Sequence, residues 1–254
     1  NINDRLVDVS RGKTIGGSSS INGMIYVRGN ACDLDQWEEL GAKDWGYRNC
    51  LPYYKKAENC AYGEDEYRGG DGPLHTCNGN GMKNPLYRAF IEAGGEAGYG
   101  ITDDYNGYRQ EGMCRMDMTV KNGVRCSTAN AYLKPVLDRS NLTVLMHALT
   151  KKVVLEGKKA IGVEFERDGK TQMIKANREV ILSAGSIGSP QIMQMSGIGP
   201  SQVLKDAGIE VVHELPGVGA NLHDHLESVI QYETKLPVSL NRHMGPLGKF
   251  LIGA

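Results

Sequence analysis

The clustering of glycine constrains the fold of this chain more than any other feature of its sequence. The 254 residues include 33 glycines, about twice the average usage of roughly 7%. They form no low-complexity repeat, and many stand in short clusters between apolar runs, one of which spans residues 12–24. Glycine is favoured where a backbone takes a positive φ or comes very close to a ligand. The clusters therefore predict a binding site.

Charge and apolar content exclude two classes of protein. The 29 basic and 30 acidic side chains are mixed along the chain, which gives no broad positive field of the kind that nucleic-acid binding uses. No stretch approaches the roughly 18 apolar residues that a membrane span needs, and residues 1–5 have no signal-peptide core. We therefore expect a soluble, cytoplasmic chain with no nucleic-acid partner.

The spacing of apolar residues predicts secondary structure along the whole chain. Helical spacing predicts helices over 33–40, 49–58, 85–97, 188–196 and 200–207. The polar, glycine-rich stretch 61–84 predicts a loop or lid. The second half changes to the period of strands, which we expect at 142–147, 152–155, 160–166 and 171–176.

The strand pattern also predicts how the strands are arranged. Asp168 and Gly169 suit a two-residue hairpin turn, so we expect a three- or four-stranded antiparallel unit. The run 179–185 is apolar on both faces and ends in glycine, which is typical of a strand buried in a parallel sheet. The predicted fold class is α/β with α+β features.

Common catalytic motifs are incomplete in this sequence. Arg11–Thr14 resembles the end of a phosphate-binding P-loop, but Val7 stands where that pattern requires glycine. The full dinucleotide fingerprint Gly-x-Gly-x-x-Gly and the nucleophile elbow Gly-x-Ser-x-Gly are also absent from the sequence. The sequence therefore contains no complete P-loop, dinucleotide-binding fingerprint or nucleophile elbow.

Two groups of residues raise the question of a metal site. The six cysteines never stand in a Cys-x-x-Cys pair, so we expect free thiols rather than disulfides or zinc ligands. His223, Asp224 and His225 are suitable ligand types, but neighbours in an extended segment point to opposite sides. We therefore expect no metal, and a loop in which Asn221, Asp224 and His225 bond buried backbone groups.

The segment 16–23 has the chemistry of a cofactor loop. Paired glycines allow a flat ring or a diphosphate to approach the main chain, and successive N–H groups form an anion-binding nest. The serine hydroxyls and the Asn22 amide add hydrogen-bonding groups. An ordinary Gly/Ser loop is the alternative interpretation.

Two long segments together resemble one family. Residues 12–35 are similar to the first signature of the glucose-methanol-choline (GMC) oxidoreductases, and residues 185–199 match the second. Residues 213–225 resemble the turn that follows it. Within that family, segments 70–73, 102–112, 125–129 and 225–227 are similar to the choline-oxidising members. The resemblance covers almost the whole chain, but only the middle of such an enzyme, without its amino-terminal dinucleotide-binding unit or its carboxy-terminal catalytic part.

The resemblance implies FAD-dependent oxidation of choline to betaine aldehyde, with hydride transfer to flavin N5 and electrons passed to an acceptor. It implies a partial FAD-binding domain over residues 1–225, with a lid or loop insertion at about 33–84, and the start of a substrate-binding domain over residues 226–254. A catalytic base is expected in the carboxy-terminal part, so no catalytic residue is assigned in this chain. The parent enzyme is expected to associate with a membrane.

The family positions also imply binding residues. Those at the isoalloxazine and ribityl groups are Gly16, Gly17, Ser18, Asn22, Gly23 and Met24. Thr150 is implied to contact adenine through its backbone, and Ala184 and Gly185 to lie near the adenosine. Glu227 stands where choline-oxidising relatives place a carboxylate against the trimethylammonium group. Ile21 occupies the position at which some relatives attach FAD to histidine, so FAD is expected to bind non-covalently.

Alternatives to this function remain. By itself, the chain is expected to be inactive, because it lacks the base and the dinucleotide-binding unit. A second hypothesis is a non-catalytic folded module that self-associates through exposed sheet edges. A third is that the parent is a GMC-fold enzyme acting on another alcohol or on a cyanohydrin.

Overall fold

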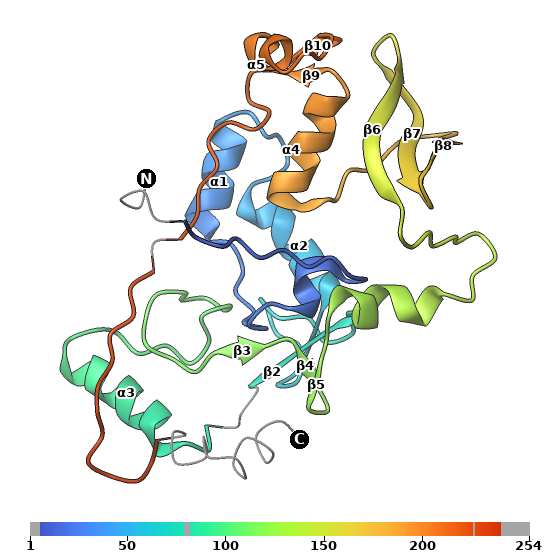
Figure 1. Ribbon diagram of the computed structural model, residues 1–254. Helices are drawn as coiled ribbons and strands as arrows, with labels where there is room; N and C mark the ends of the chain where they lie inside the picture. The colour runs from blue at the N-terminus through green and yellow to red at the C-terminus, as the bar shows by residue number, and fades with distance from the viewer. Residues whose placement is uncertain (1–5, 79–81, 226, 240–254) are drawn as a thin grey trace. The chain divides into compact units, whose positions relative to one another are not determined.

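The computed structural model describes residues 6–78, 82–225 and 227–239, and the chain divides into two compact units (Figure 1). The first unit comprises Asn1–Leu142 together with Tyr232–Ala254. The second unit comprises Thr143–Gln231. Both units combine helices with small sheets, so the mixed α/β class predicted from the sequence is confirmed.

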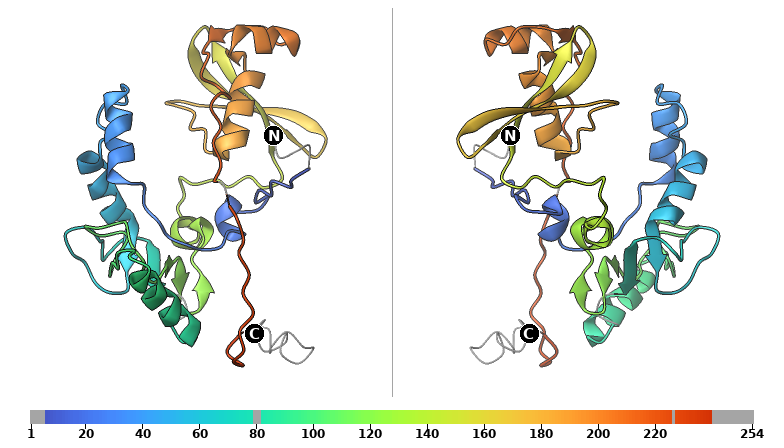
Figure 2. Two further views of the ribbon diagram at one scale, coloured as in Figure 1. Left: turned by 90° about the vertical axis from the view of Figure 1, so that its left-hand side faces the viewer. Right: turned by 90° about the vertical axis from the view of Figure 1, so that its right-hand side faces the viewer.

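The described residues of the first unit form three α-helices, α1 (Ala31–Glu39), α2 (Tyr47–Ala57) and α3 (Pro85–Glu96). The side chains of Asn30 and Asn84 cap α1 and α3, because each accepts a hydrogen bond from a backbone N–H of the first turn. Helices α1 and α2 lie side by side (Figures 1 and 2). All three helices were predicted from the sequence to within one turn at each end.

Short strands connect the rest of the first unit. Strand β1 (Glu58–Cys60) pairs in parallel with β2 (Leu74–Asn78), and β2 pairs antiparallel with β3 (Asp117–Met118). Strands β4 (Val120–Lys121) and β5 (Val124–Arg125) form a separate hairpin. Among the residues that the structure describes, the apolar side chains buried in this unit are few, namely Leu34, Cys60, Tyr105, Val120, Cys126, Ala129 and Ala131.

Short helical turns follow in the described part of the first unit. They are η1 (Gly17–Ser20), a π-helical turn η2 (Ala129–Leu133) and η3 (Lys134–Val136). Turn η1 belongs to the glycine-rich segment that the sequence predicts to bind a cofactor. Turns η2 and η3 follow the β4–β5 hairpin directly.

A buried carboxylate at the start of β1 organises this unit. The Glu58 side chain is fully buried, and Arg28 and Arg68 approach it with N···O distances of 2.6 and 2.7 Å. The Thr76 hydroxyl donates a third hydrogen bond, at 2.6 Å. Burial alone would raise the pKa of Glu58, but the hydrogen bonds from Arg68 and Thr76 outweigh it and hold this pKa below its ordinary value.

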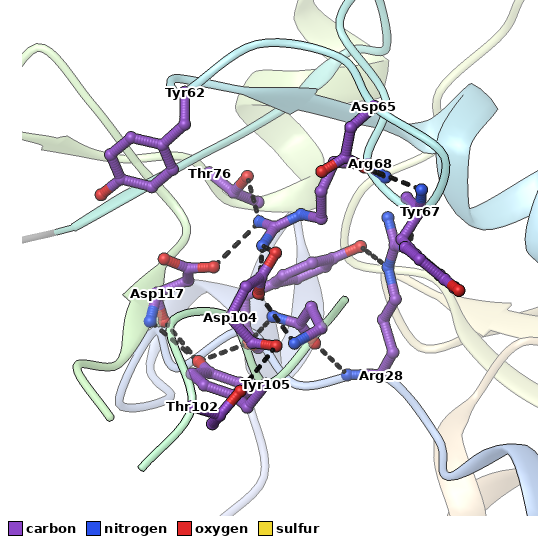
Figure 3. Close-up of polar contacts among 12 residues, drawn as sticks. Arg28, Tyr62, Asp65, Tyr67, Arg68, Thr76, Thr102, Asp104, Tyr105 and Asp117 are labelled. Carbon is purple, nitrogen blue, oxygen red and sulfur yellow. Dashed lines mark hydrogen bonds and ion pairs between the residues drawn. The ribbon is translucent and has the colours of Figure 1, made fainter. Parts of the chain in front are cut away.

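Arg68 extends the cluster to a distant loop and to β3. Its guanidinium forms ion pairs with Asp104 at 2.8 Å and with Asp117 at 2.9 Å (Figure 3). Asp104 also accepts the N–H of Asn106, and Asn106 Oδ1 accepts the N–H of Arg28 at 2.9 Å. Segments around residues 28, 58, 68, 104 and 117 are thereby held together by charge and hydrogen bonds.

Tyr105 lies beside this ionic cluster and is itself buried. Its hydroxyl donates to the carbonyl of Tyr26 at 2.7 Å and accepts the N–H of Asp117 at 2.8 Å. Burial raises the pKa of Tyr105 to about 12, so the group stays protonated and remains a donor.

The second unit is built on one antiparallel sheet of β6 (Leu149–Glu156), β7 (Lys159–Arg167) and β8 (Lys170–Lys175), in that order. Asp168 and Gly169 both have positive φ, 53° and 71°, as a two-residue turn between twisted strands requires. The predicted hairpin and antiparallel unit are therefore confirmed.

Helix α4 (Gly185–Met195) lies against β6 (Figure 2). Buried Ser196 joins them, because its hydroxyl accepts the N–H of Val153 at 2.8 Å and donates to the carbonyl of Ile192 at 2.6 Å. The apolar core of this unit consists of Val153, Phe165, Ile192, Leu204 and Val218.

The remaining elements of the second unit are short. They are β9 (Ile198–Gly199), α5 (Ser201–Asp206) and β10 (His213–Glu214), with β9 and β10 paired in parallel. Helices α4 and α5 confirm the two helices that the sequence predicts in this region.

Two predicted strands are wrong. Residues 142–147 and 179–185 belong to no strand, and α4 begins at Gly185. A strand needs a hydrogen-bonded neighbour, and neither run pairs with another segment in the described part of the chain. The Ile181 side chain is 77% exposed, so the second run is not buried on both faces as predicted.

The predicted loop over 61–84 is also wrong in part, because it contains β2. Residues 79–81 lie outside the described residues. The sequence of β2 lacks the apolar alternation that marks most strands. Its central residue, Thr76, is a buried polar residue whose hydroxyl donates a hydrogen bond to Glu58.

Two expectations from composition concern the whole chain. All six cysteines are free thiols, as predicted. Among the described residues, no helix combines the length and apolar character that crossing a membrane would require.

The ionic cluster predicts a large effect of Glu58→Gln. The substitution removes the charge that two buried guanidinium groups face, and breaking such a pair typically destabilises by about 3–5 kcal/mol. We expect a loss of this order in the free energy of unfolding, measured by urea denaturation. Glu92→Gln, on the exposed face of α3, is the matched control and should change it by less than about 0.5 kcal/mol.

The same pair of proteins gives a pH test. The pKa of Glu58 is lowered by folding, so its stabilisation is present above its ordinary pKa and is lost as the pH falls through the folded value. Acidification below that ordinary pKa should therefore destabilise the unsubstituted chain more than the Glu58→Gln variant. Parallel pH profiles would contradict the role of this carboxylate.

Candidate functional site

The glycine-rich loop, residues 12–24, needs two of its glycines for its own fold. A Cβ atom at Gly12 would overlap the carbonyl group of Gly17. A Cβ atom at Gly16 would lie 2.5 Å from the Ser20 hydroxyl, and Gly16 has a φ of +87°. These two positions therefore exclude side chains through steric overlap and backbone conformation.

Two other glycines of the loop face open space. A Cβ atom at Gly17 or Gly23 would meet no atom of the described residues within 4 Å. Gly17 has a φ of +54°, which explains the glycine there, but the φ of Gly23 is not positive. The fold of the described residues thus gives no reason for glycine at position 23, and a flat group lying against the loop would give one.

Hydrogen bonds from residues far along the chain hold the loop in shape. The Ser19 hydroxyl donates to the Gly16 carbonyl at 2.5 Å and accepts the N–H of Thr128 at 3.0 Å. Arg125 Nη1 donates to the Ser19 carbonyl at 3.2 Å and to the Asn22 carbonyl at 2.7 Å. The loop is therefore fastened to β5 and to the start of η2.

The polar side chains predicted to contact a cofactor also serve the loop itself. The Ser18 hydroxyl accepts the N–H of Gly12 at 3.1 Å. Asn22 Oδ1 accepts from Met24 N at 3.1 Å and from Arg125 at 2.9 Å. Their positions are fixed by these bonds, so the predicted residues Gly16, Gly17, Ser18, Asn22, Gly23 and Met24 lie together on one ordered loop of the first unit.

The other predicted cofactor residues lie in the second unit. Thr150 stands opposite Phe165 in the β6–β7 pair, next to an irregularity in the register. It lines a cavity of about 380 Å³ together with Phe165 and Ile181. Ala184 precedes α4, and Gly185 begins it with a φ of +84° and open space around its Cα.

The remaining polar positions singled out from the sequence are exposed. Glu227 is exposed, and so are His223, Asp224 and His225. Within the part of the chain that the structure describes, the Asp224 side chain accepts a hydrogen bond only from the N–H of His225, so the expected loop that satisfies buried backbone groups is wrong. In the described part of the chain, no cluster of three His, Cys, Asp or Glu side chains is arranged to hold a metal ion.

Sequence reasoning missed the residues that shape the loop. Arg125 and Thr128 make its main long-range contacts, and the sequence alone gives neither of them a role in the loop. Arg125 and Thr128 stand in the segment 125–129, which was noted only for its resemblance to the family. Their contacts span more than a hundred residues of sequence, so no local pattern indicates them.

Comparison with known proteins identifies the family to which this chain is similar. A model of the GMC oxidoreductase family matches residues 1–227. An oxygen-dependent choline dehydrogenase from Photobacterium profundum is 58% identical over 253 residues. One from Rhizobium etli is 54% identical over 240 residues.

The alignments cover most of this chain but less than half of each relative. They include 99% and 94% of this chain, and 44% and 43% of the two dehydrogenases. Among solved structures, an FAD-dependent oxidoreductase from Chaetomium thermophilum matches with a TM-score of 0.78 and 32% identity, over 85% of this chain and 40% of that one. A pyridoxine 4-oxidase from Mesorbium loti matches with a TM-score of 0.72 and 33% identity, over 81% and 41%.

The contacts of Arg125 predict that Arg125→Ala loosens the loop. Hydrogen bonds to a charged group contribute about 1.5–3 kcal/mol each, so local opening should rise by about tenfold or more. Amide hydrogen exchange of a peptide covering residues 16–24 measures it. Arg88→Ala, at an exposed position of α3, should leave this exchange unchanged. Equal exchange in both variants would refute the role of Arg125.

Proposed function

The chain belongs to the GMC oxidoreductase family, and from this premise we propose that the whole protein is an FAD-dependent choline dehydrogenase that oxidises choline to betaine aldehyde. The observation that carries the proposal is the 58% identity over 253 residues to enzymes named oxygen-dependent choline dehydrogenase. The chain spans about 44% of the length of the first of them. We propose that it forms the central part of such an enzyme and is inactive alone.

The glycine-rich loop fits FAD as a bound group. Gly17 and Gly23 present backbone with open space in front of it, as a flat ring requires. We propose that the loop binds the isoalloxazine and ribityl groups through residues 16–18 and 22–24. Ile21 has no nucleophilic atom, so the attachment is non-covalent. When bound, FAD supplies the acceptor for the substrate hydride.

The second unit supplies the proposed contacts to the other end of FAD. Gly185 offers exposed backbone at a positive φ of 84°, beside Ala184, and both are proposed to lie near the adenosine. Thr150 is proposed to contact adenine through its backbone. The proposed domains are a partial FAD-binding domain over 1–225, with a lid or loop insertion at about 33–84, and the start of a substrate-binding domain over 226–254.

Glu227 is proposed to bind the substrate cation. A quaternary ammonium group donates no ordinary hydrogen bond, so a site for it needs negative charge and aromatic faces. Glu227 is an exposed carboxylate and supplies the charge. The proposed partners are choline, an electron acceptor and, through open sheet edges, further copies of the chain, with a cytoplasmic location and membrane association of the whole enzyme.

The open space at Gly23 predicts a selective effect of Gly23→Ala. The added methyl group meets no atom of the described residues, so the free energy of unfolding should change by less than about 0.5 kcal/mol. The methyl group would stand where we place the flavin, so in a protein of full family length the FAD-to-protein absorbance ratio should fall several-fold.

Gly29→Ala is the matched control. Its Cβ atom would make an ordinary contact, at 3.5 Å from the Tyr54 hydroxyl, and its φ is not positive. This variant should keep both its stability and its FAD. If Gly23→Ala retains as much FAD as Gly29→Ala, the flavin does not lie against Gly23.

The role of Glu227 predicts a charge-specific effect of Glu227→Gln on the full-length enzyme. Loss of one ionic contact should raise the KM for choline about tenfold, equivalent to about 1.4 kcal/mol. The KM for the neutral isostere 3,3-dimethylbutan-1-ol should not change, nor should that for choline in the exposed control Glu233→Gln. An unchanged KM for choline in Glu227→Gln would favour another alcohol or a cyanohydrin as substrate.

A further inference from the structure

A basic cavity of about 630 Å³ lies in the first unit, on the β5 side of the glycine-rich loop. Strand β2, the β4–β5 hairpin and the turns η2 and η3 contribute its walls. Its polar lining includes the side chains of His75, Lys121, Arg125, Asn130 and Lys134. Its volume is within the range of about 300–1,000 Å³ that is typical of small-molecule sites.

The cavity is cationic and lacks counter-charge. Lys121, Arg125 and Lys134 line it, and no described Asp or Glu does. None of these three forms an ion pair within the described residues, whereas Arg28 and Arg68 of the same unit each face a buried carboxylate. Positive charges gathered around one cavity repel each other, and an anion between them would remove that repulsion.

The Arg125 guanidinium has N–H groups that do not contact the glycine-rich loop. The hydrogen bonds that its side chain makes to Ser19 and Asn22 of the glycine-rich loop all come from Nη1. Its Nε and Nη2 form no hydrogen bond with the described residues. The planar guanidinium presents its N–H groups in a fork that suits two oxygens of a carboxylate or a phosphate. Asn130 fixes the backbone at this point by donating to the Arg125 carbonyl at 2.8 Å.

His75 adds a group that would respond to an anion. Its Nδ1 lies 3.1 Å from Asn59 Oδ1, so the bond requires the proton on Nδ1 and leaves Nε2 as an acceptor. Burial lowers the pKa of His75, and so does the positive charge of Lys121. Arg125 and Lys134 are the other charged groups of the cavity, and an anion among them would shift this pKa upward.

We propose that the basic cavity binds a small dianion, a phosphate or dicarboxylate group, and that Arg125 couples its occupancy to the order of the glycine-rich loop. An anion on the Nε–Nη2 edge restricts the guanidinium whose Nη1 holds Ser19 and Asn22. Binding of the anion does not depend on the proposed function. Only the effect of that loop order on FAD binding rests on the proposed function.

Titration of the chain with inorganic phosphate at constant ionic strength tests the site. We expect saturable binding by calorimetry, with an upward shift of the His75 pKa followed by NMR. Lys121→Gln/Lys134→Gln should weaken binding about tenfold or more, and Lys43→Gln/Lys56→Gln, at exposed positions outside the cavity, should not. Malonate in place of phosphate distinguishes a dicarboxylate from a phosphate site.

The outcomes separate the two parts of the proposal. Absence of saturable binding of either anion would overturn the site, as would equal affinity in the two double variants. All four lysines are exposed, and thermal melting checks that both variants fold. Coupling predicts that saturating phosphate slows amide exchange of residues 16–24 at least twofold in the unsubstituted chain. Phosphate binding without this protection would overturn the coupling while leaving the FAD proposal intact.

Discussion

The buried interaction of Glu58 with Arg68 is the constraint on which the first unit depends. This unit buries few apolar side chains, so apolar contact alone does not fix its irregular segments. Arg68 connects Glu58 of β1 to Asp117 of β3, and Arg28 adds a second guanidinium on Glu58. Charges out of water are tolerated only when each is paired and hydrogen-bonded, so one arrangement of these segments is strongly preferred to others.

The same cluster positions the glycine-rich loop from its carboxy-terminal end. The carbonyl of Asp117 accepts the N–H of Tyr26, and the N–H of Thr119 donates to the carbonyl of Met24. Arg125 and Thr128 hold the loop between Gly16 and Asn22. The backbone of the proposed cofactor loop is therefore fixed at both ends without a ligand, which would reduce the entropy lost on binding.

Local signals predicted helices α1 to α5, but not strand β2, which pairs in parallel with β1, or the contacts of the loop. The cap at Asn84 and the proline after it are sufficient to place α3. The runs 142–147 and 179–185 have strand composition, yet pairing is a property of a neighbouring segment and not of the run itself. Glycines 16, 17 and 23 identify the loop from sequence, whereas Arg125 contacts it across about a hundred residues.

A glycine indicates a ligand site only where neither steric overlap nor a positive φ already requires glycine. Gly12 and Gly16 are needed to avoid overlap within the loop, and the positive φ of Gly17 explains that residue. Gly23 meets neither condition, so the space in front of it is not used by the described residues. The loop therefore supports cofactor binding most strongly at position 23, where the fold itself would accept a side chain and the sequence has none.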